Sequence, residues 1–333
     1  MCIFAPLITY MRKILFNLTV LLAAVLVAGA CQQEPKAVLF DTDWWTDVDD
    51  ALALRLLANL QEDGALVLKG VNLSAYDSTS VETISKFMEY CGIGDIPLGV
   101  DKQAGDYPGH PRYRDVILED TTATARFHSI DDCEDCVDYY RRMLSLTKGK
   151  VDIISVGFPN ALARLCESEA DDYSKLGGKE LILKKVNHLW MMAGQYPEGR
   201  EHNFWRTQRS RDAAEVICTE WPTPVTFLGF EVGLPVFSGS QLPREDLLSK
   251  ILFAHGSGAG RNSWDPMTVL LAAQGSPEAA GYDYVQGTVT VNTDYGNNTF
   301  EPSEDGPHRY VVMKEDPEYY RSILDTLLMP RHQ

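Results

Sequence analysis

Short apolar and β-branched runs alternate with segments of helical periodicity from about residue 37 to about residue 275. The two differ in period and length, because a buried strand is a brief apolar run and a helix repeats every 3.6 residues. The predicted strands cover residues 37–40, 66–73, 96–100, 151–157, 188–193 and 225–229. The predicted helices cover residues 51–58, 80–90, 136–146, 160–167, 211–218, 244–253 and 266–273. This alternation predicts an α/β fold with a mostly parallel central sheet flanked by helices, a Rossmann-like core.

The last part of the chain has a different pattern. Residues 284–291 and 308–313 alternate with a period of two, and residues 294–298 have the composition of a tight turn. A closing helix is predicted over residues 317–328. We therefore expect a C-terminal β-hairpin appended to the parallel sheet, within one domain of residues 37–333. Residues 103–131, rich in Gly, Pro and Thr, predict a long loop of the kind that often serves an active site.

Residues 1–30 are predicted to be a signal peptide. Arg12 and Lys13 precede an apolar stretch that ends in small residues just before Cys31. The stretch is too short and wrongly flanked for a stable membrane span. It resembles the lipobox of bacterial lipoproteins, which implies lipidation of Cys31, a tether over residues 31–36 and export to the periplasmic or outer face of a bacterial membrane. Ordinary signal cleavage nearby is the alternative.

The charge of the chain argues against polymeric nucleic acid as a partner. The sequence has 30 Lys and Arg against 47 Asp and Glu, and without Arg12 and Lys13 the mature chain carries 28 − 47 = −19. So acidic a surface repels nucleic-acid phosphates and anionic lipid. We expect a small neutral or weakly charged ligand, and membrane contact only through the lipid anchor. Assembly into a homo-oligomer is left open.

The densest candidate chemistry lies between the first predicted strand and helix. Five carboxylates fall within residues 41–50, at the carboxyl end of the strand: Asp41, Asp43, Asp47, Asp49 and Asp50. Ligands of open α/β sheets bind at that edge. One or two of these acids could cap the helix. Five would repel one another without a cation, and clusters of oxygen ligands suit Ca²⁺ or Mg²⁺. A solvated, capped loop is the alternative to a metal site.

A further carboxylate, Asp265, occurs far downstream. It precedes Pro266, a residue tolerated in the first turn of a helix, so we expect Asp265 at a helix N-cap. Capping by itself would explain this residue. The neighbouring Trp264, considered alone, is more often a core residue than a platform for a ligand.

Several separated segments, in the right order, resemble the inosine-uridine-preferring nucleoside hydrolase family. Asp41-Thr42-Asp43 and Asp49-Asp50-Ala51 match the two ends of its D-x-D-P-G-x-D-D-A signature. Residues 157–161 match its G-P-L-T-N turn, and Glu201-His202-Asn203 matches its E-F-N segment. Trp264-Asp265 matches the family's late aspartate, which follows an aromatic ring.

The resemblance implies a Ca²⁺-dependent hydrolase of N-glycosidic bonds in ribonucleosides. Its metal ligands would be Asp43, Asp50, Asp265 and the backbone carbonyl of Asn160. A water and two ribose hydroxyls would complete a coordination number of ~8, which suits Ca²⁺ better than Mg²⁺. Asp43 would also act as the catalytic base.

The remaining substrate contacts follow from the same resemblance. Asp49 would bind the ribose diol, and Glu201 and Asn203 the other sugar hydroxyls. Trp264 would take part in catalysis by stacking on the leaving base, with a preference for purines.

The first loop departs from the family pattern. Trp44 and Trp45 begin an insertion where the signature has Pro-Gly, which predicts two bulky rings beside the sugar and allows Asp47 to displace a ligand. Three other functions therefore stay open: hydrolysis of another glycoside, calcium-stabilised binding of a sugar or nucleoside without cleavage, and an Mg²⁺-dependent phosphatase of the haloacid dehalogenase type.

Overall fold

The computed structural model describes residues 35–105 and 110–331. From Lys36 onward these residues form one compact unit built on an eleven-stranded sheet. The predicted signal peptide, Cys31 and most of the tether lie outside the described residues. Across the sheet the strands are β4 (Glu134–Asp135), β3 (Leu98–Val100), β2 (Leu66–Leu73), β1 (Lys36–Thr42), β5 (Val151–Ser155), β6 (Val186–Met192), β8 (Val225–Leu228), β13 (His308–Met313), β11 (Tyr282–Val291), β12 (Asn298–Pro302) and β7 (Glu198–Gly199).

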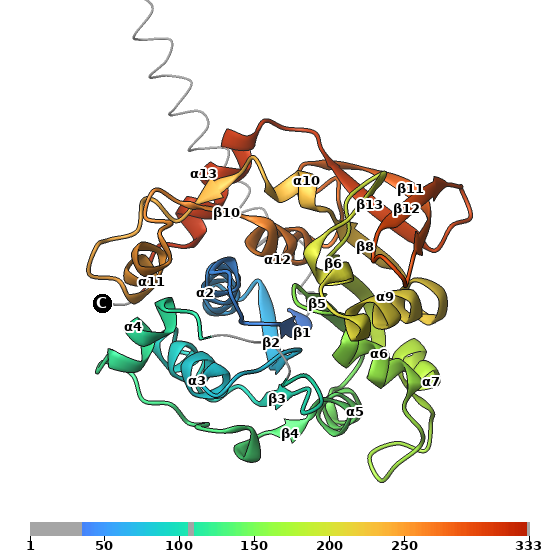
Figure 1. The fold of residues 1–333 in the computed structure, drawn as a ribbon, viewed down its shortest axis with the longest axis horizontal. Helices are drawn as coiled ribbons and strands as arrows, with labels where there is room; N and C mark the ends of the chain where they lie inside the picture. The colour runs from blue at the N-terminus through green and yellow to red at the C-terminus, as the bar shows by residue number, and fades with distance from the viewer. Residues whose placement is uncertain (1–34, 106–109, 332–333) are drawn as a thin grey trace, which may run out of the picture. The chain divides into compact units, whose positions relative to one another are not determined.

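The strand directions confirm the predicted fold class. All neighbours from β4 to β13 pair in parallel, whereas β11, β12 and β7 pair antiparallel. The C-terminal section is more elaborate than one hairpin, because β11 turns into β12 and the chain then returns as β13. Strand β13 lies between β8 and β11, so it joins the antiparallel end to the parallel core (Figure 1).

Two layers of helices cover the sheet (Figure 1). One layer contains α2 (Asp49–Glu62), α3 (Ser80–Tyr90), α4 (Tyr113–Glu119), α11 (Leu247–His255), α12 (Trp264–Gln274) and α13 (Pro317–Leu327). The other contains α5 (Cys136–Leu146), α6 (Asn160–Glu167), α7 (Gly178–Lys185) and α9 (Gln208–Glu220). Strand β1 serves both cores: Val38 and Phe40 pack with the first layer and Leu39 with the second. Burial on both faces explains the continuous apolar run of this strand.

Gly157 lets two strand ends approach each other. It follows β5, and a Cβ at this position would lie 2.4 Å from the backbone nitrogen of Asp43 and 2.4 Å from Ser74 Oγ. A side chain there would push the acidic loop away from the sheet, so the site requires glycine at this position.

Single-turn helices were not predicted. Helices α8 (His202–Trp205) and α10 (Phe230–Gly233) each follow a strand end, and four residues cannot display a helical period. The segment predicted as the long loop 103–131 contains α4, which packs on α3 and α11. Helix α12 begins at Trp264, two residues earlier than expected, so Asp265 lies inside its first turn and Ser263 is the N-cap. Among the residues described, no helix is long and apolar enough to cross a membrane.

Candidate active site

A cavity of about 260 Å³ opens at the carboxyl ends of the central parallel strands. Its lining comes from the segments that follow β1, β5, β6 and β8, together with the first turn of α12. The acidic lining residues are Asp43, Asp47, Asp49, Asp50, Glu201 and Asp265. A volume of this order suits a small ligand.

Three buried carboxylates converge at the base of this cavity. Asp49 and Asp50 begin α2 and Asp265 lies in the first turn of α12, and an oxygen from each lies within 4.8 Å of the other two. Helices α2 and α12 pack side by side, which brings Asp265 to the early acids (Figure 1). The backbone N–H of Asp265 donates to Asp49 Oδ2 at 3.3 Å. Asp43 lines the same cavity.

Burial and mutual repulsion raise the pKa of these acids. The pKa values of Asp43, Asp49 and Asp265 all lie well above the usual range, chiefly through burial and then through neighbouring carboxylates. Burial raises the pKa of Asp50 to about 6, although hydrogen bonds from Thr42 and the backbone of Trp44 oppose the shift. Charged carboxylates this close are stable only with positive charge between them.

The donor set fits a divalent cation. Several carboxylate oxygens converge, all of them hard ligands of the kind that Ca²⁺ and Mg²⁺ prefer. The nearest lining cation, Arg261, is engaged by Asp47 instead: its Nε donates to Asp47 Oδ1 at 2.7 Å, and a second nitrogen donates to Oδ2. This ion pair lowers the pKa of Asp47 against the effect of its burial. Asp47 therefore neutralises Arg261.

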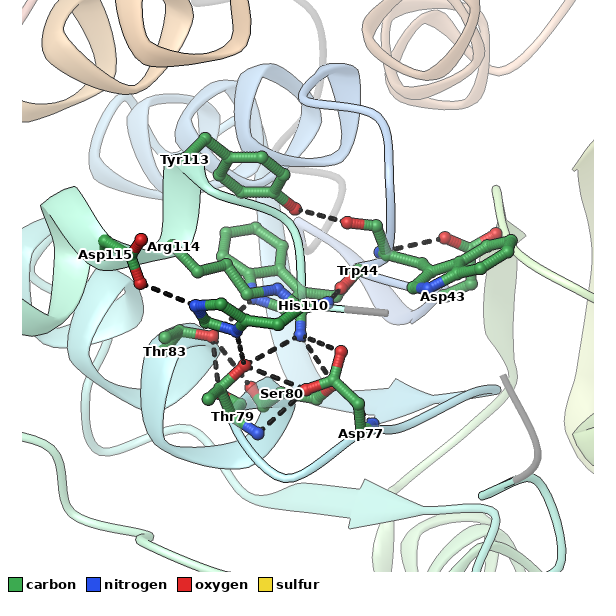
Figure 2. A network of polar contacts seen from close by, with 11 residues as sticks. Asp43, Trp44, Asp77, Thr79, Ser80, Thr83, His110, Tyr113, Arg114 and Asp115 are labelled. Carbon is green, nitrogen blue, oxygen red and sulfur yellow. Dashed lines mark hydrogen bonds and ion pairs between the residues drawn. The ribbon is translucent and has the colours of Figure 1, made fainter. Parts of the chain in front are cut away.

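Helix α4 holds the backbone of the acidic loop from one side. Arg114, which is fully buried, donates to the carbonyl of Trp44 and to Asp77, Thr79 and Ser80 (Figure 2). Its neighbour Tyr113 donates its hydroxyl to the carbonyl of Trp45 at 2.8 Å. These contacts fix the turn that follows Asp43.

The expectation that Trp44 lies beside the sugar is corrected. Its side chain is fully buried, its ring packs 5.6 Å from that of Phe87, and its Nε1 donates to Thr83 Oγ1 at 3.0 Å. Its backbone has φ of 45°, a left-handed conformation that costs energy in a non-glycine residue. The buried ring and the bond to Arg114 hold that conformation, so Trp44 is an anchor of the loop.

Trp45 does line the cavity, with its backbone N–H donating to Asp43 Oδ1 at 3.1 Å. Trp264 also lines the cavity, and its Nε1 donates to the carbonyl of Phe230 at 2.7 Å. The Trp264 ring stacks on Phe230 at 5.4 Å, and the guanidinium of Arg261 lies 5.3 Å from its centre. Trp45 and Trp264 are thus the two indoles that the structure places at the cavity.

Glu201 and Asn203 lie where α8 begins, after β6. Glu201 accepts hydrogen bonds from the backbone N–H groups of Gly194 and Asn203, and its burial raises its pKa to about 7. The Asn203 amide donates to the carbonyls of Val156 and Met192, each at 2.9 Å. Both residues line the cavity, and their contact with a sugar stays a prediction.

Asn160 does not line the cavity. Its side chain donates to the carbonyl of Ser74 at 2.8 Å and to Asp101 Oδ2 at 2.6 Å, away from the acid cluster. Arg164 forms ion pairs with both Asp101 and Asp135. These two acids therefore belong to an ion-pair network that is separate from the cluster of Asp49, Asp50 and Asp265. The expected role of Asn160 is metal binding through its backbone carbonyl, and this role stays a prediction.

Sequence reasoning missed Arg261, Arg114 and His202 as residues of this region. Arg114 lies in the segment taken for a loop, and nothing local marks Arg261 as the partner of Asp47. The signal for His202 was available, since it stands inside the Glu201-His202-Asn203 triplet where the resembled family has Phe.

Comparison with solved structures agrees with this architecture. A plant nucleoside hydrolase, PpNRh1, superposes with a TM-score of 0.66 at 19% identity, over 88% of this chain and 99% of that one. The inosine-uridine preferring nucleoside hydrolase from Bacillus anthracis gives 0.61 at 17% identity, over 88% and 99%. The chain has the nucleoside hydrolase fold. The same fold occurs in the type III effector XopQ complexed with adenosine diphosphate ribose, at a TM-score of 0.61 and 17% identity over 89% of this chain and 93% of that one.

Comparison of sequences gives no further relative of this chain beyond these structural neighbours. No protein-family model matches the chain, and no curated protein matches it. Because the structural neighbours share under a fifth of their residues with it, they establish the fold and leave the chemistry to the residues of the site.

Proposed function

We propose that this protein is a Ca²⁺-dependent hydrolase of N-glycosidic bonds in ribonucleosides, with a preference for purines. The observation that carries the proposal is the convergence of Asp49, Asp50 and Asp265 within 4.8 Å, in a cavity shared with Glu201 and Asn203. Carboxylates and an amide in the lining of one cavity suit a sugar with several hydroxyls. The fold is that of nucleoside hydrolases, which agrees with this chemistry.

The metal ligands would be Asp50 and Asp265, with Asp43 and the carbonyl of Asn160. Asp49 would accept hydrogen bonds from the ribose diol, although its oxygen also lies within the convergent group. A bound Ca²⁺ supplies positive charge that orients sugar hydroxyls and makes the attacking water more acidic.

The reaction requires three tasks of the side chains. Asp43 takes a proton from a water molecule as the oxygen of that water attacks C1′ of the sugar. The bond between C1′ and the base nitrogen breaks, and its electron pair stays on the base. Negative carboxylates stabilise the oxocarbenium-like charge on the sugar. Glu201 and Asn203 hold the sugar, and Trp264 supports the departing base.

A product assay tests the proposal. The protein is incubated with ribonucleosides, simple glycosides, ADP-ribose and a phosphate monoester, with Ca²⁺ or with chelator. Release of free base that stops on chelation supports the proposal, and D43N should reduce it by at least ~100-fold. Release of phosphate would indicate the phosphatase, cleavage of another glycoside would change the substrate class, and binding without turnover would indicate a receptor.

We also propose that the protein is exported and lipid-anchored through Cys31. The support is the signal pattern that ends in small residues before this cysteine. Expression with labelled palmitate should label the wild-type chain and leave C31S unlabelled. Labelling of both chains, or of neither, would contradict the anchor.

A further inference from the structure

Within the Glu201-His202-Asn203 triplet, only His202 is exposed. The carboxylate of Glu201 is bonded to backbone N–H groups, and the Asn203 amide is bonded to two carbonyls. His202 begins α8, is exposed and lines the cavity. Its two neighbours therefore use their polar atoms on the backbone, whereas the ring of His202 is left at the cavity.

Aromatic rings hold the imidazole in place. Its centroid lies 6.0 Å from that of Trp45 and 5.8 Å from that of Phe158, and the ring of Trp205 meets it edge-on at 5.6 Å. No hydrogen bond among the described residues uses its ring nitrogens. The structure thus presents two unused polar atoms on a ring whose position is fixed by packing, at the edge of a ligand cavity.

Two other lining residues, Trp264 and Arg261, already have partners for polar groups of their side chains. Trp264 uses its Nε1 on the carbonyl of Phe230, and Arg261 uses its guanidinium on Asp47. A heterocyclic base departing from the sugar carries ring nitrogens that become more electron-rich as the bond breaks. Those atoms need a polar partner, and the ring nitrogens of His202 are available in the same cavity.

We propose that His202 is a specificity-determining residue that hydrogen-bonds the leaving heterocycle. This inference rests on the proposed function and assigns the leaving-group end of the same cavity. Desolvation of the imidazole among the surrounding rings, and then the charge of Arg206, lower the pKa of His202 to about 4, so near pH 7 the ring carries one N–H donor and one acceptor. That pair of groups matches the mixed donors and acceptors of a purine edge.

Two variants and two substrates test the role of His202. H202F keeps a flat ring but removes both nitrogens, and H202Q restores a hydrogen-bonding group. Turnover of inosine is compared with that of 4-nitrophenyl ribofuranoside, which has the sugar but lacks the ring nitrogens. His128, exposed on the surface outside the cavity, provides the matched control H128F.

We expect H202F to lower kcat/KM for inosine by about tenfold, the size of one hydrogen bond, with 4-nitrophenyl ribofuranoside within twofold of wild type. H202Q should recover much of the loss, and H128F should match wild type on both substrates. Equal losses on the two substrates, or no loss on inosine, would overturn the inference. Turnover of the nitrophenyl substrate also shows that each variant is folded.

Failure of the proposed function gives a different result. If the wild-type protein releases no base from any nucleoside, that function falls, and binding of inosine is then measured by calorimetry. A roughly tenfold weaker affinity in H202F would still support the contact with the heterocycle. Equal affinity in both proteins, or binding by neither, would overturn it.

Discussion

Glu201 illustrates how one buried side chain couples the site to pH. Its carboxyl is almost fully buried and accepts hydrogen bonds from two backbone N–H groups, and burial raises its pKa from 4.5 to about 7. The folded state therefore keeps a proton that the unfolded chain releases at lower pH. The contribution of Glu201 to stability is greatest below pH 4.5 and falls as the pH rises to about 7.

The predicted loss of stability through Glu201 over that interval is roughly 3 kcal/mol, because each pKa unit corresponds to about 1.4 kcal/mol. Urea denaturation at pH 5 and pH 8, in chelator, measures it. E201Q should show a smaller fall in unfolding free energy between the two pH values. An identical pH dependence in both proteins would contradict the assignment.

Trp264 carries the predicted purine preference. Stacking of a base on an aromatic side chain contributes about 1–3 kcal/mol, so W264A should lower kcat/KM for inosine by about 10- to 100-fold. A riboside with a good synthetic leaving group should lose far less, since its departure needs little support. W264F keeps a flat face and serves as the matched variant. Equal losses on both substrates would remove the stacking role.

Among elements, α4 has the most direct influence on the acidic loop. Its residue Arg114 binds the carbonyl of Trp44 (Figure 2), and Tyr113 binds the carbonyl of Trp45, which belongs to the next peptide bond. The resembled family has Pro-Gly at this point, where the chain can turn without support. Here a tryptophan with a left-handed backbone is stabilised from outside the loop.

Loosening that support should weaken metal binding. We expect R114M to lower Ca²⁺ affinity by about 10- to 100-fold, a size typical of residues that orient metal ligands, and R114K to retain part of the affinity. Titration calorimetry measures the effect. Asp115, on the same helix, points away from Trp44 towards His110, so D115N is the control. Unchanged affinity in a folded R114M would contradict the positioning role.

At the scale of the whole molecule, the site joins distant parts of the chain. Asp265 donates its backbone N–H to Asp49, 216 positions earlier, and α12 packs against α2. A cation held by acids of both α2 and α12 binds only the folded state, because the two helices meet only there. Occupancy of the site is thus linked to the stability of the entire unit.

Calcium should therefore raise the melting temperature of the wild-type protein, by an amount equivalent to about 2.7 kcal/mol at a hundredfold excess over Kd. D265N should lose this response, yet melt higher than wild type in chelator because one repelling carboxylate is gone. Differential scanning calorimetry with and without Ca²⁺ measures both effects. The exposed Asp305 provides the control D305N. A calcium response that survives in D265N would contradict its role as a ligand.

The segments with a long, clear pattern were predictable from sequence. Helices α3, α5 and α6 cover the residues predicted for them, as do β2 and β13, because their apolar periodicity is local. The acids after β1 were also recognisable as a candidate site, since ligands of parallel sheets bind at the carboxyl ends of the strands. Asp265 was joined to them only through the family resemblance. The helices α8 and α10 were not predictable, because four residues are too few to show the apolar repeat of a helix.

The sequence by itself determined the class of fold and which residue types could form the site, because periodicity and turn chemistry act between neighbours in the chain. Only the tertiary structure decided which acids converge, that Asp47 pairs with Arg261, and that Trp44 is buried while Trp45 faces the cavity. Those outcomes depend on contacts between segments far apart in sequence. The energy of such contacts is set by packing and burial, which no local pattern encodes.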